Sequence, residues 1–311
     1  ENAIELNPNF SEVHNNLGNA FKDLGQLDDA VKSYQKAVSI DNNLYEAYYN
    51  LGVVFIQLKR FNEAIKSFES AIEINPNFAQ AHNNLGSALM SLGKLKESIK
   101  YFKKSLDVDS DYVNALNNLG IALTDVGQLK DGAKSIERAI EIDPDFAEAH
   151  NSLGNIFKKF KKRDKALICY ERAYAIKPDM DFVLGSILNS KMHLCFWDDF
   201  SNQLEDLTRR VNNNEKTIDP FNQLGLIDNP ALQRKVTEIR MNSAHPKSQI
   251  LPKINPYPKH SKIRIGYFSA DFKIHPVATL TAELYEVHDR NYFEIYAFSF
   301  GPDTNDEMNL R

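Results

Sequence analysis

A 34-residue repeat runs through the first half of this 311-residue sequence and constrains its fold more than any other feature. A Leu-Gly pair marks each repeat, and its leucines are Leu17, Leu51, Leu85, Leu119 and Leu153. A fixed period of this length indicates a stack of small units, none of which can bury its apolar face alone. The step defines five units, 11–44, 45–78, 79–112, 113–146 and 147–180. Residues 1–10 match the end of an earlier unit, so we expect that the sequence starts inside a repeat.

Each unit is predicted to be two antiparallel helices joined by a short turn, with no strand between residues 11 and 180. Val13, Leu17, Phe21 and Leu24 are spaced by four, four and three residues, as on one face of a helix. Leu17 and Phe21 are therefore expected in the core, as is Tyr34 from the second helix. Prolines are expected to stop the second helix, and they stand at Pro8, Pro76, Pro144 and Pro178. Small residues should let the paired helices approach closely, and they stand at Ala30, Ala64, Ser98, Gly132 and Ala166. In its period and in these positions, the region 1–180 resembles the tetratricopeptide repeat, which implies a right-handed superhelix with a concave groove.

An asparagine precedes the Leu-Gly pair in four of the five units, and a packing role does not require an amide at that position. These residues are Asn16, Asn50, Asn84 and Asn118, whereas Ser152 takes the fifth place. An amide side chain is both a donor and an acceptor, so a row of them could bind the backbone of an extended peptide. The alternative is that each asparagine bonds only to a neighbouring helix. The spacing alone does not decide between the two.

Three histidines also share one repeat position, with Tyr48 and Leu116 in the units between them. They are His14, His82 and His150. Alternate units lie roughly 20 Å apart at ordinary helix spacings, which is too far for a shared metal ion. We expect these side chains to be semi-buried packing residues, and we expect no metal site. The His193–Cys195 pair lacks a second ligand cluster, so residues 192–197 are also predicted to pack in the core.

The repeat weakens after residue 180, and a second type of structure follows. We expect a transition of degenerate helices over 181–243, a proline-rich linker over 244–262, and the beginning of an α/β domain over 263–311. Residues 262–269 and 293–300 are rich in β-forming residues and predict two strands, and residues 277–287 predict a helix between them. A strand, a helix and a strand predict a right-handed βαβ unit.

The loop 270–276 follows the first strand, where sites in such sheets lie. It contains His275, which precedes the helix and should be neutral there. His275 could therefore act as a base or hydrogen-bond partner, or it could only cap the helix. No G-x-G-x-x-G follows the strand, so a dinucleotide site is not indicated.

The motif Ile265-Gly266-Tyr267-Phe268-Ser269-Ala270-Asp271-Phe272, followed by His275-Pro276, resembles the opening of the catalytic region in protein O-linked N-acetylglucosamine transferases, including SPINDLY-like members. The Cys195-Phe196-Trp197 stretch after the repeats resembles the same family. The resemblance implies that the asparagines hold the acceptor polypeptide, and that Ser152 interrupts this row. It implies that His275 lies in the active site of a two-lobed Rossmann-like enzyme that needs no metal, whose second lobe binds most of the nucleotide sugar. One βαβ unit is too little for a complete sheet, so we expect a piece of a larger enzyme that is inactive by itself.

Composition limits the remaining function classes. Thirty-seven basic and 42 acidic residues leave a net charge of −5, so a nucleic-acid partner is not indicated. Two cysteines, Cys169 and Cys195, cannot form a disulfide framework and suit a reducing compartment. With neither a visible signal peptide nor a long apolar run, we expect a cytoplasmic location and no membrane partner.

The leading interpretation is a mostly α protein that is part of a glycosyltransferase moving N-acetylglucosamine from UDP-N-acetylglucosamine to Ser or Thr of polypeptides. The alternatives are a non-catalytic peptide-binding scaffold and a SPINDLY-like O-fucosyltransferase. The expected partners are acceptor polypeptides in the repeat groove and, in the full-length protein, the nucleotide sugar. The repeats could also join copies of the chain.

Overall fold

The computed structural model describes residues 10–244, 261–269 and 289–299. Its contacts divide the chain into two compact units, residues 1–247 and residues 248–311. The described elements of the first unit are all helices, and the described elements of the second are two β-strands. No helix of the described ranges is long and apolar enough to cross a membrane.

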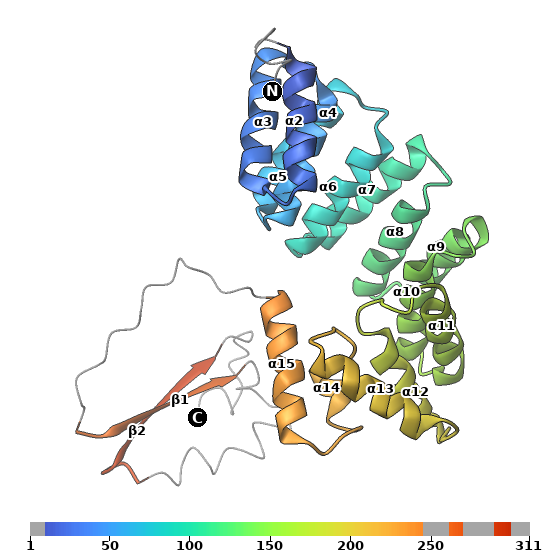
Figure 1. Ribbon diagram of the computed structural model, residues 1–311, viewed down its shortest axis with the longest axis vertical. Helices are drawn as coiled ribbons and strands as arrows, with labels where there is room; N and C mark the ends of the chain where they lie inside the picture. Colours follow the sequence, from blue (N-terminus) through green and yellow to red (C-terminus); the bar gives the residue numbers. More distant parts are fainter. Residues whose placement is uncertain (1–9, 245–260, 270–288, 300–311) are drawn as a thin grey trace. The chain divides into compact units, whose positions relative to one another are not determined.

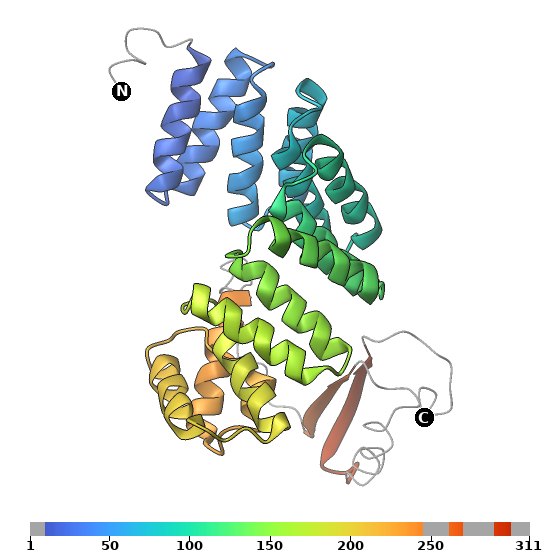
Figure 2. The ribbon, with the colours of Figure 1, turned by 90° about the vertical axis from the view of Figure 1, so that its right-hand side faces the viewer.

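Five helix pairs form the repeats and stack in sequence order (Figures 1 and 2). Each first helix has 13 residues and each second helix has 14. The first helices are α2 (Ser11–Asp23), α4 (Tyr45–Gln57), α6 (Ala79–Ser91), α8 (Val113–Asp125) and α10 (Ala147–Lys159). The second helices are α3 (Leu27–Ile40), α5 (Phe61–Ile74), α7 (Leu95–Val108), α9 (Leu129–Ile142) and α11 (Arg163–Ile176). This confirms the predicted helix pairs and the absence of strands over 11–180.

Close contact between the two helices of a pair explains the repeated glycine and the small residues. A Cβ atom on Gly86 would lie 2.6 Å from a ring carbon of Phe102, and Gly18, Gly52 and Gly154 meet an aromatic ring at similar distances. The small residues at the opposite position are fully buried in four units, as Ala30, Ala64, Ser98 and Ala166. In the fourth unit, a Cβ atom on Gly132 would meet the Thr124 hydroxyl at 2.5 Å. Size at these positions therefore sets the separation of the helices.

A left-handed residue stands two positions after the end of each first helix, where the chain reverses direction. Gly25, Gly93 and Gly127 have φ values of 73°, 74° and 86°, and Lys59 and Lys161 occupy the same place with φ of 58° and 61°. The following N–H bonds to a carbonyl five residues earlier, as from Lys94 to Leu89 at 3.0 Å. This is the Schellman arrangement that satisfies the last carbonyls of a helix.

The second helices end at the same position whether or not a proline follows. Helices α5, α9 and α11 end two residues before Pro76, Pro144 and Pro178, as predicted. Helices α3 and α7 end at the same repeat position although no proline follows them. There the side chains of Asp41 and Asp109 accept a hydrogen bond from the N–H two residues further on, at 2.9 and 3.1 Å. Such a turn competes with the helix for the backbone.

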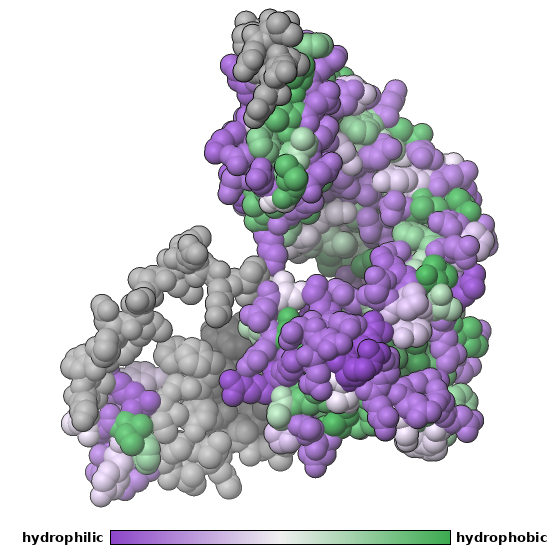
Figure 3. Space-filling view, in the orientation of Figure 1, coloured by the Kyte–Doolittle hydropathy of each residue, from purple (hydrophilic) through white to green (hydrophobic). Residues whose placement is uncertain are grey.

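Tyr34 is fully buried, which confirms its predicted place in the core, but Leu17 and Phe21 are only half-buried. Their counterparts Leu51, Leu85 and Phe55 are buried. The difference arises because α2 belongs to the first described unit, whereas later units are covered on both sides. Apolar side chains consequently show on the surface over α2 in Figure 3.

A degenerate pair follows the repeats, formed by α12 (Val183–Leu194) and α13 (Phe200–Asn212), and then α14 (Pro220–Gln223) and α15 (Pro230–Ala244). They share a core with Leu188, Leu207, Val211, Ile218 and Val236. The pair and the helix expected around 229–243 are therefore both present.

In the second unit, β1 (Ile263–Ser269) and β2 (Phe293–Ser299) pair in parallel, with Ile263 opposite Phe293. A parallel pair needs a crossover connection, as the predicted βαβ unit supplies. The expected helix over 277–287 lies outside the described residues.

Candidate peptide-binding groove

The asparagine positions lie on the first helices, which form the inner side of the stack. Successive first helices contact one another, α4 with α6, α6 with α8, and α8 with α10. Equivalent helices of a curved stack come closest together on its concave side, where repeat proteins bind extended ligands. Asn50, Asn84 and Asn118 are half-buried there, and Asn16 is exposed.

The asparagines link each unit to the one before it. The Nδ2 of Asn50 donates to Oδ1 of Asn15 at 3.1 Å, and that of Asn84 donates to the Tyr49 hydroxyl at 3.0 Å. The Nδ2 of Asn118 donates to Oδ1 of Asn83 at 2.9 Å. These bonds account for one N–H of Asn50 and of Asn84, which leaves their second N–H for another partner. The Nδ2 of Asn118 also donates to the Ser87 hydroxyl at 3.4 Å.

The acceptors of these bonds all stand at one repeat position, immediately before the asparagine row, and the sequence reasoning missed them. The visible signal was the Asn-Asn doublet, which occurs at Asn15, Asn83 and Asn117. In the second unit the acceptor is Tyr49, and its burial raises the pKa of its hydroxyl although the bond from Asn84 lowers it. The hydroxyl is therefore neutral at physiological pH.

The row is interrupted at the fifth unit. Ser152 stands where the next asparagine would donate to Asn117, and its side chain is buried. The Oδ1 atom of Asn117 is also buried, and it has no hydrogen-bond partner in the described part of the chain. A serine side chain is too short to replace the missing amide.

Two adjoining pockets lie at this interruption. One has a volume of about 480 Å³ and is lined in part by Asn117, Glu148 and Met180. The other has a volume of about 690 Å³ and is lined in part by Thr124 and Lys158. Both pockets share Ile121, Asn151 and Ser152. The groove is thus hollowed where the asparagine row stops.

The histidines that share a repeat position, His14, His82 and His150, are buried or half-buried. The Nε2 atoms of His82 and His150 lie 2.9 Å from the carbonyl oxygens of Pro76 and Pro144, which end the preceding units. Burial is the main cause that lowers the pKa of His82. Its ring therefore stays neutral and donates from Nε2. Within the described residues, no cluster of His, Cys, Asp and Glu could hold a metal ion.

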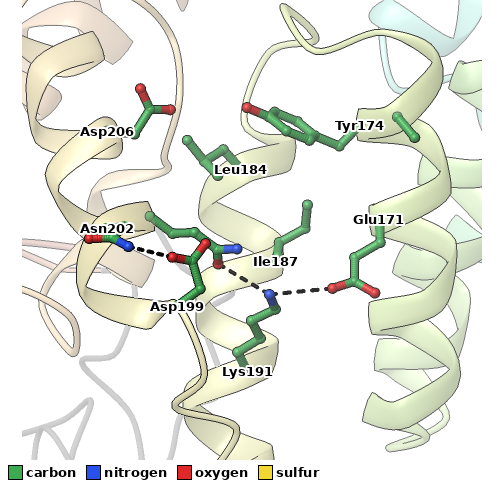
Figure 4. A pocket seen from close by; sticks show the side chains of 10 residues that line it. Glu171, Tyr174, Leu184, Ile187, Lys191, Asp199, Asn202 and Asp206 are labelled. Atoms are coloured by element: carbon green, nitrogen blue, oxygen red, sulfur yellow. Dashed lines mark hydrogen bonds and ion pairs between the residues drawn. The ribbon is translucent and has the colours of Figure 1, made fainter.

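A further pocket of about 360 Å³ lies between α11, α12 and α13 (Figure 4). Its central Lys191 donates to Oε1 of Gln203 at 3.2 Å and pairs with Glu171 at 3.4 Å. Asn202 donates to Asp199 at 2.6 Å. The polar groups of this pocket hold the degenerate pair against the last repeat, so we assign it no catalytic role.

The prediction that residues 192–197 pack in the core is wrong for most of this segment. Phe196 and Trp197 are exposed, and so are His193 and Cys195. The physical reason is that α12 ends at Leu194 and Cys195 is left-handed, with φ of 57°. The segment therefore leaves the helix before its apolar face can be buried. Both cysteines are free thiols.

His275, the predicted active-site residue, lies outside the described residues, as does its loop. The described ends of β1 and β2 pair in register through Ser269 and Ser299. Arg264 and Glu294 form an exposed cross-strand ion pair at 2.7 Å, and Arg264 lowers the pKa of the Glu294 carboxyl.

Comparison with known families agrees with the repeats. Residues 45–78 and 79–112 each match the tetratricopeptide repeat, and further matches to models of this repeat cover residues 1–32, 18–59 and 117–181. The chain is a tetratricopeptide-repeat protein. Residues 221–311 match glycosyl transferase family 41, so the repeats lead into a region of glycosyltransferase type.

Solved structures share the helical fold. The chain resembles the type IV pilus biogenesis factor PilW, with 21% identity and a TM-score of 0.61, over 70% of this chain and 98% of PilW. It also resembles PilF of Pseudomonas aeruginosa, with 17% identity and a TM-score of 0.57, over 64% of this chain and 90% of PilF. These likenesses concern the fold alone. No curated protein matches the sequence significantly.

Proposed function

We propose that the chain is part of a protein O-glycosyltransferase that moves N-acetylglucosamine from UDP-N-acetylglucosamine to Ser or Thr of polypeptides. The observation that carries this proposal is the combination of two features in one chain. A row of asparagine amides lies on the inner helices of the repeats, and the region 221–311 matches glycosyl transferase family 41. A scaffold needs only the first of these features.

The proposal assigns a separate task to each part of the sequence. Residues 1–180 bind the acceptor polypeptide, and residues 181–243 and 244–262 connect the repeats to the strands. Residues 263–311 begin the sheet of the catalytic region, although the match to the family already starts at residue 221. Attack of an acceptor hydroxyl on the anomeric carbon needs a positioned base and stabilisation of the leaving diphosphate. His275 is proposed to lie beside the reacting groups, without assignment as the base.

The test uses the full-length protein that contains this segment, incubated with acceptor peptides and either labelled UDP-N-acetylglucosamine or labelled GDP-fucose. We expect transfer from the first donor. Transfer from GDP-fucose alone would establish the SPINDLY-like alternative. If neither donor is used while peptides still bind, the protein is a scaffold.

Two variants of that protein separate binding from chemistry. His275→Ala should lower transfer at least about tenfold, or about 1.4 kcal/mol in the barrier, with peptide affinity unchanged. The triple change Asn50→Ala, Asn84→Ala and Asn118→Ala should instead weaken peptide binding, by roughly 1 kcal/mol for each lost hydrogen bond. Unchanged kinetics in a folded His275→Ala protein would exclude its active-site role, and unchanged peptide affinity in the triple variant would leave the asparagines structural.

A further inference from the structure

The interruption of the asparagine row leaves one buried polar group unsatisfied. In the units before it, the amide at the row position donates to the preceding unit, as Asn118 donates to Asn83 at 2.9 Å. At the fifth unit this donor is absent because the residue is Ser152. The Oδ1 of Asn117 is left buried with no partner in the described residues, and the Asn117 side chain as a whole is only 6% exposed. An amide oxygen without a hydrogen bond is unfavourable in a buried site.

Asn117 lies in the wall of the 480 Å³ pocket, next to Ile121 and Ser152. A group that enters this pocket can therefore complete the hydrogen bonding of the amide. The Oδ1 atom has almost no accessible surface, so the amide must rotate about its Cβ–Cγ bond to meet that group. This torsion is broad in asparagine, and the rotation is inexpensive.

The surroundings favour a polypeptide backbone over a charged ligand. Two of the three acidic residues of the wall are paired, Glu148 with Lys177 at 3.0 Å and Asp181 with Lys216 at 3.1 Å, and the third, Asp179, is exposed to solvent. Ile121 and Met180 add apolar surface for side chains. The second pocket adjoins the first at Ile121, Asn151 and Ser152, so the hollow continues past Ser152. A peptide group carries a donor and an acceptor together, as the asparagine amide does.

We propose that Asn117 is a backbone anchor for an extended polypeptide, whose main-chain N–H donates to Asn117 Oδ1 in the space left by the missing asparagine. The fifth unit is then a distinct docking point on the groove, created by serine at position 152. The proposal rests on the proposed function only in taking a polypeptide as the ligand.

The decisive variant is Ser152→Asn in the 311-residue chain, because it supplies the missing donor and closes the space. The probe is a capped synthetic peptide of alternating serine and valine, compared with its backbone N-methylated analogue. No sugar donor is present. We expect wild type to prefer the unmethylated peptide. Ser152→Asn should weaken its binding at least about fivefold, the ratio for one net hydrogen bond, while raising the urea midpoint of unfolding. If position 152 were only a missing member of the peptide-binding asparagine row, the added amide would strengthen binding instead.

Two further variants make the test complete. Asn117→Leu removes the acceptor at similar volume and should weaken peptide binding by the same factor. This variant takes the place of Ser152→Asn if Ser152→Asn does not fold. Ser91→Asn makes the same exchange at an exposed position on α6 and should change neither property. If Ser152→Asn binds the peptide as tightly as wild type does, or more tightly, Asn117 does not anchor the peptide and the proposal is overturned. It is equally overturned if wild type does not distinguish the two peptides.

The outcome is independent of catalysis. If the full-length protein transfers no sugar, the binding difference between wild type and Ser152→Asn still stands. If it transfers sugar while that difference is absent, the docking point alone is rejected.

Discussion

At the residue scale, single side chains couple neighbouring units through the backbone. His82 is buried, and its Nε2 contacts the Pro76 carbonyl at 2.9 Å, while its Nδ1 has no partner in the described residues. Protonation would place a proton on Nδ1 without an acceptor. Burial above all, and the nearby charge of Lys104, consequently hold the pKa of His82 below its ordinary value of 6.5.

This lowered pKa predicts an acid-dependent loss of stability. The contribution of neutral His82 is complete above pH 6.5 and decreases as the pH falls from there through the folded-state pKa, because the unfolded chain binds the proton more readily. His82→Leu, which copies Leu116 of the next unit, should remove this loss. Urea unfolding at several pH values should show a shallower decline for the variant, by at most about 1.4 kcal/mol per pH unit. Parallel profiles would show that His82 does not contribute.

At the element scale, the left-handed residue that ends each first helix sets the angle between paired helices. Glycine takes this conformation without strain, whereas a lysine there is strained by its Cβ atom. Lys161, with φ of 61°, is strained in this way, and Gly93 is its unstrained counterpart at φ of 74°.

Exchanging the two residue types should therefore shift stability in opposite directions. Lys161→Gly should raise the free energy of unfolding by about 0.5–1 kcal/mol, since relief of strain exceeds the added freedom of the unfolded chain. The control is Gly93→Ala, where a Cβ would meet nothing within 4 Å and only backbone strain is added. It should lower the free energy of unfolding by about 1 kcal/mol. A loss of stability in Lys161→Gly would contradict this account.

At the scale of the whole molecule, each repeat packs mainly on its neighbours along the stack, so damage should remain local. One exception is the hydrogen bond that Lys59 donates to the Ser243 carbonyl at 3.3 Å. Leu85 is 1% exposed and lies in the core cluster that includes Phe55 and Phe68 from the preceding unit. Removing it should therefore disturb the interface between these units more than the ends of the array.

Leu85→Ala should cost about 2–5 kcal/mol, as for other buried leucine truncations. The rate of backbone hydrogen exchange should rise first in α4 to α7, because the substitution uncouples the flanking units. Leu24→Ala is the control, because that side chain is 72% exposed and its truncation should change stability by less than about 0.5 kcal/mol. A similarly small change in Leu85→Ala would show that Leu85 is not a core residue.

The glycosyltransferase region illustrates a different limit of sequence reasoning. Residues 263–269 and 293–299 form strands as their β-forming residues predict, and their parallel pairing agrees with the expected βαβ unit. The role of His275 comes from resemblance to a family, because a single histidine before a helix has several physical explanations. It stays a prediction, as does the peptide-binding role of the asparagine row.

The sequence by itself determined the repeat architecture, because a 34-residue period with Leu-Gly pairs and small residues permits only one way to bury the apolar faces. It also predicted the helix ends before Pro76, Pro144 and Pro178. Only the tertiary structure showed which atoms Asn50, Asn84 and Asn118 contact, since those partners lie 35 residues earlier, on another helix. Tertiary structure also decided that Trp197 is exposed and that Oδ1 of Asn117 has no hydrogen-bond partner among the described residues. Periodicity predicts which face of a helix is buried, but hydrogen-bond partners depend on how neighbouring helices are placed.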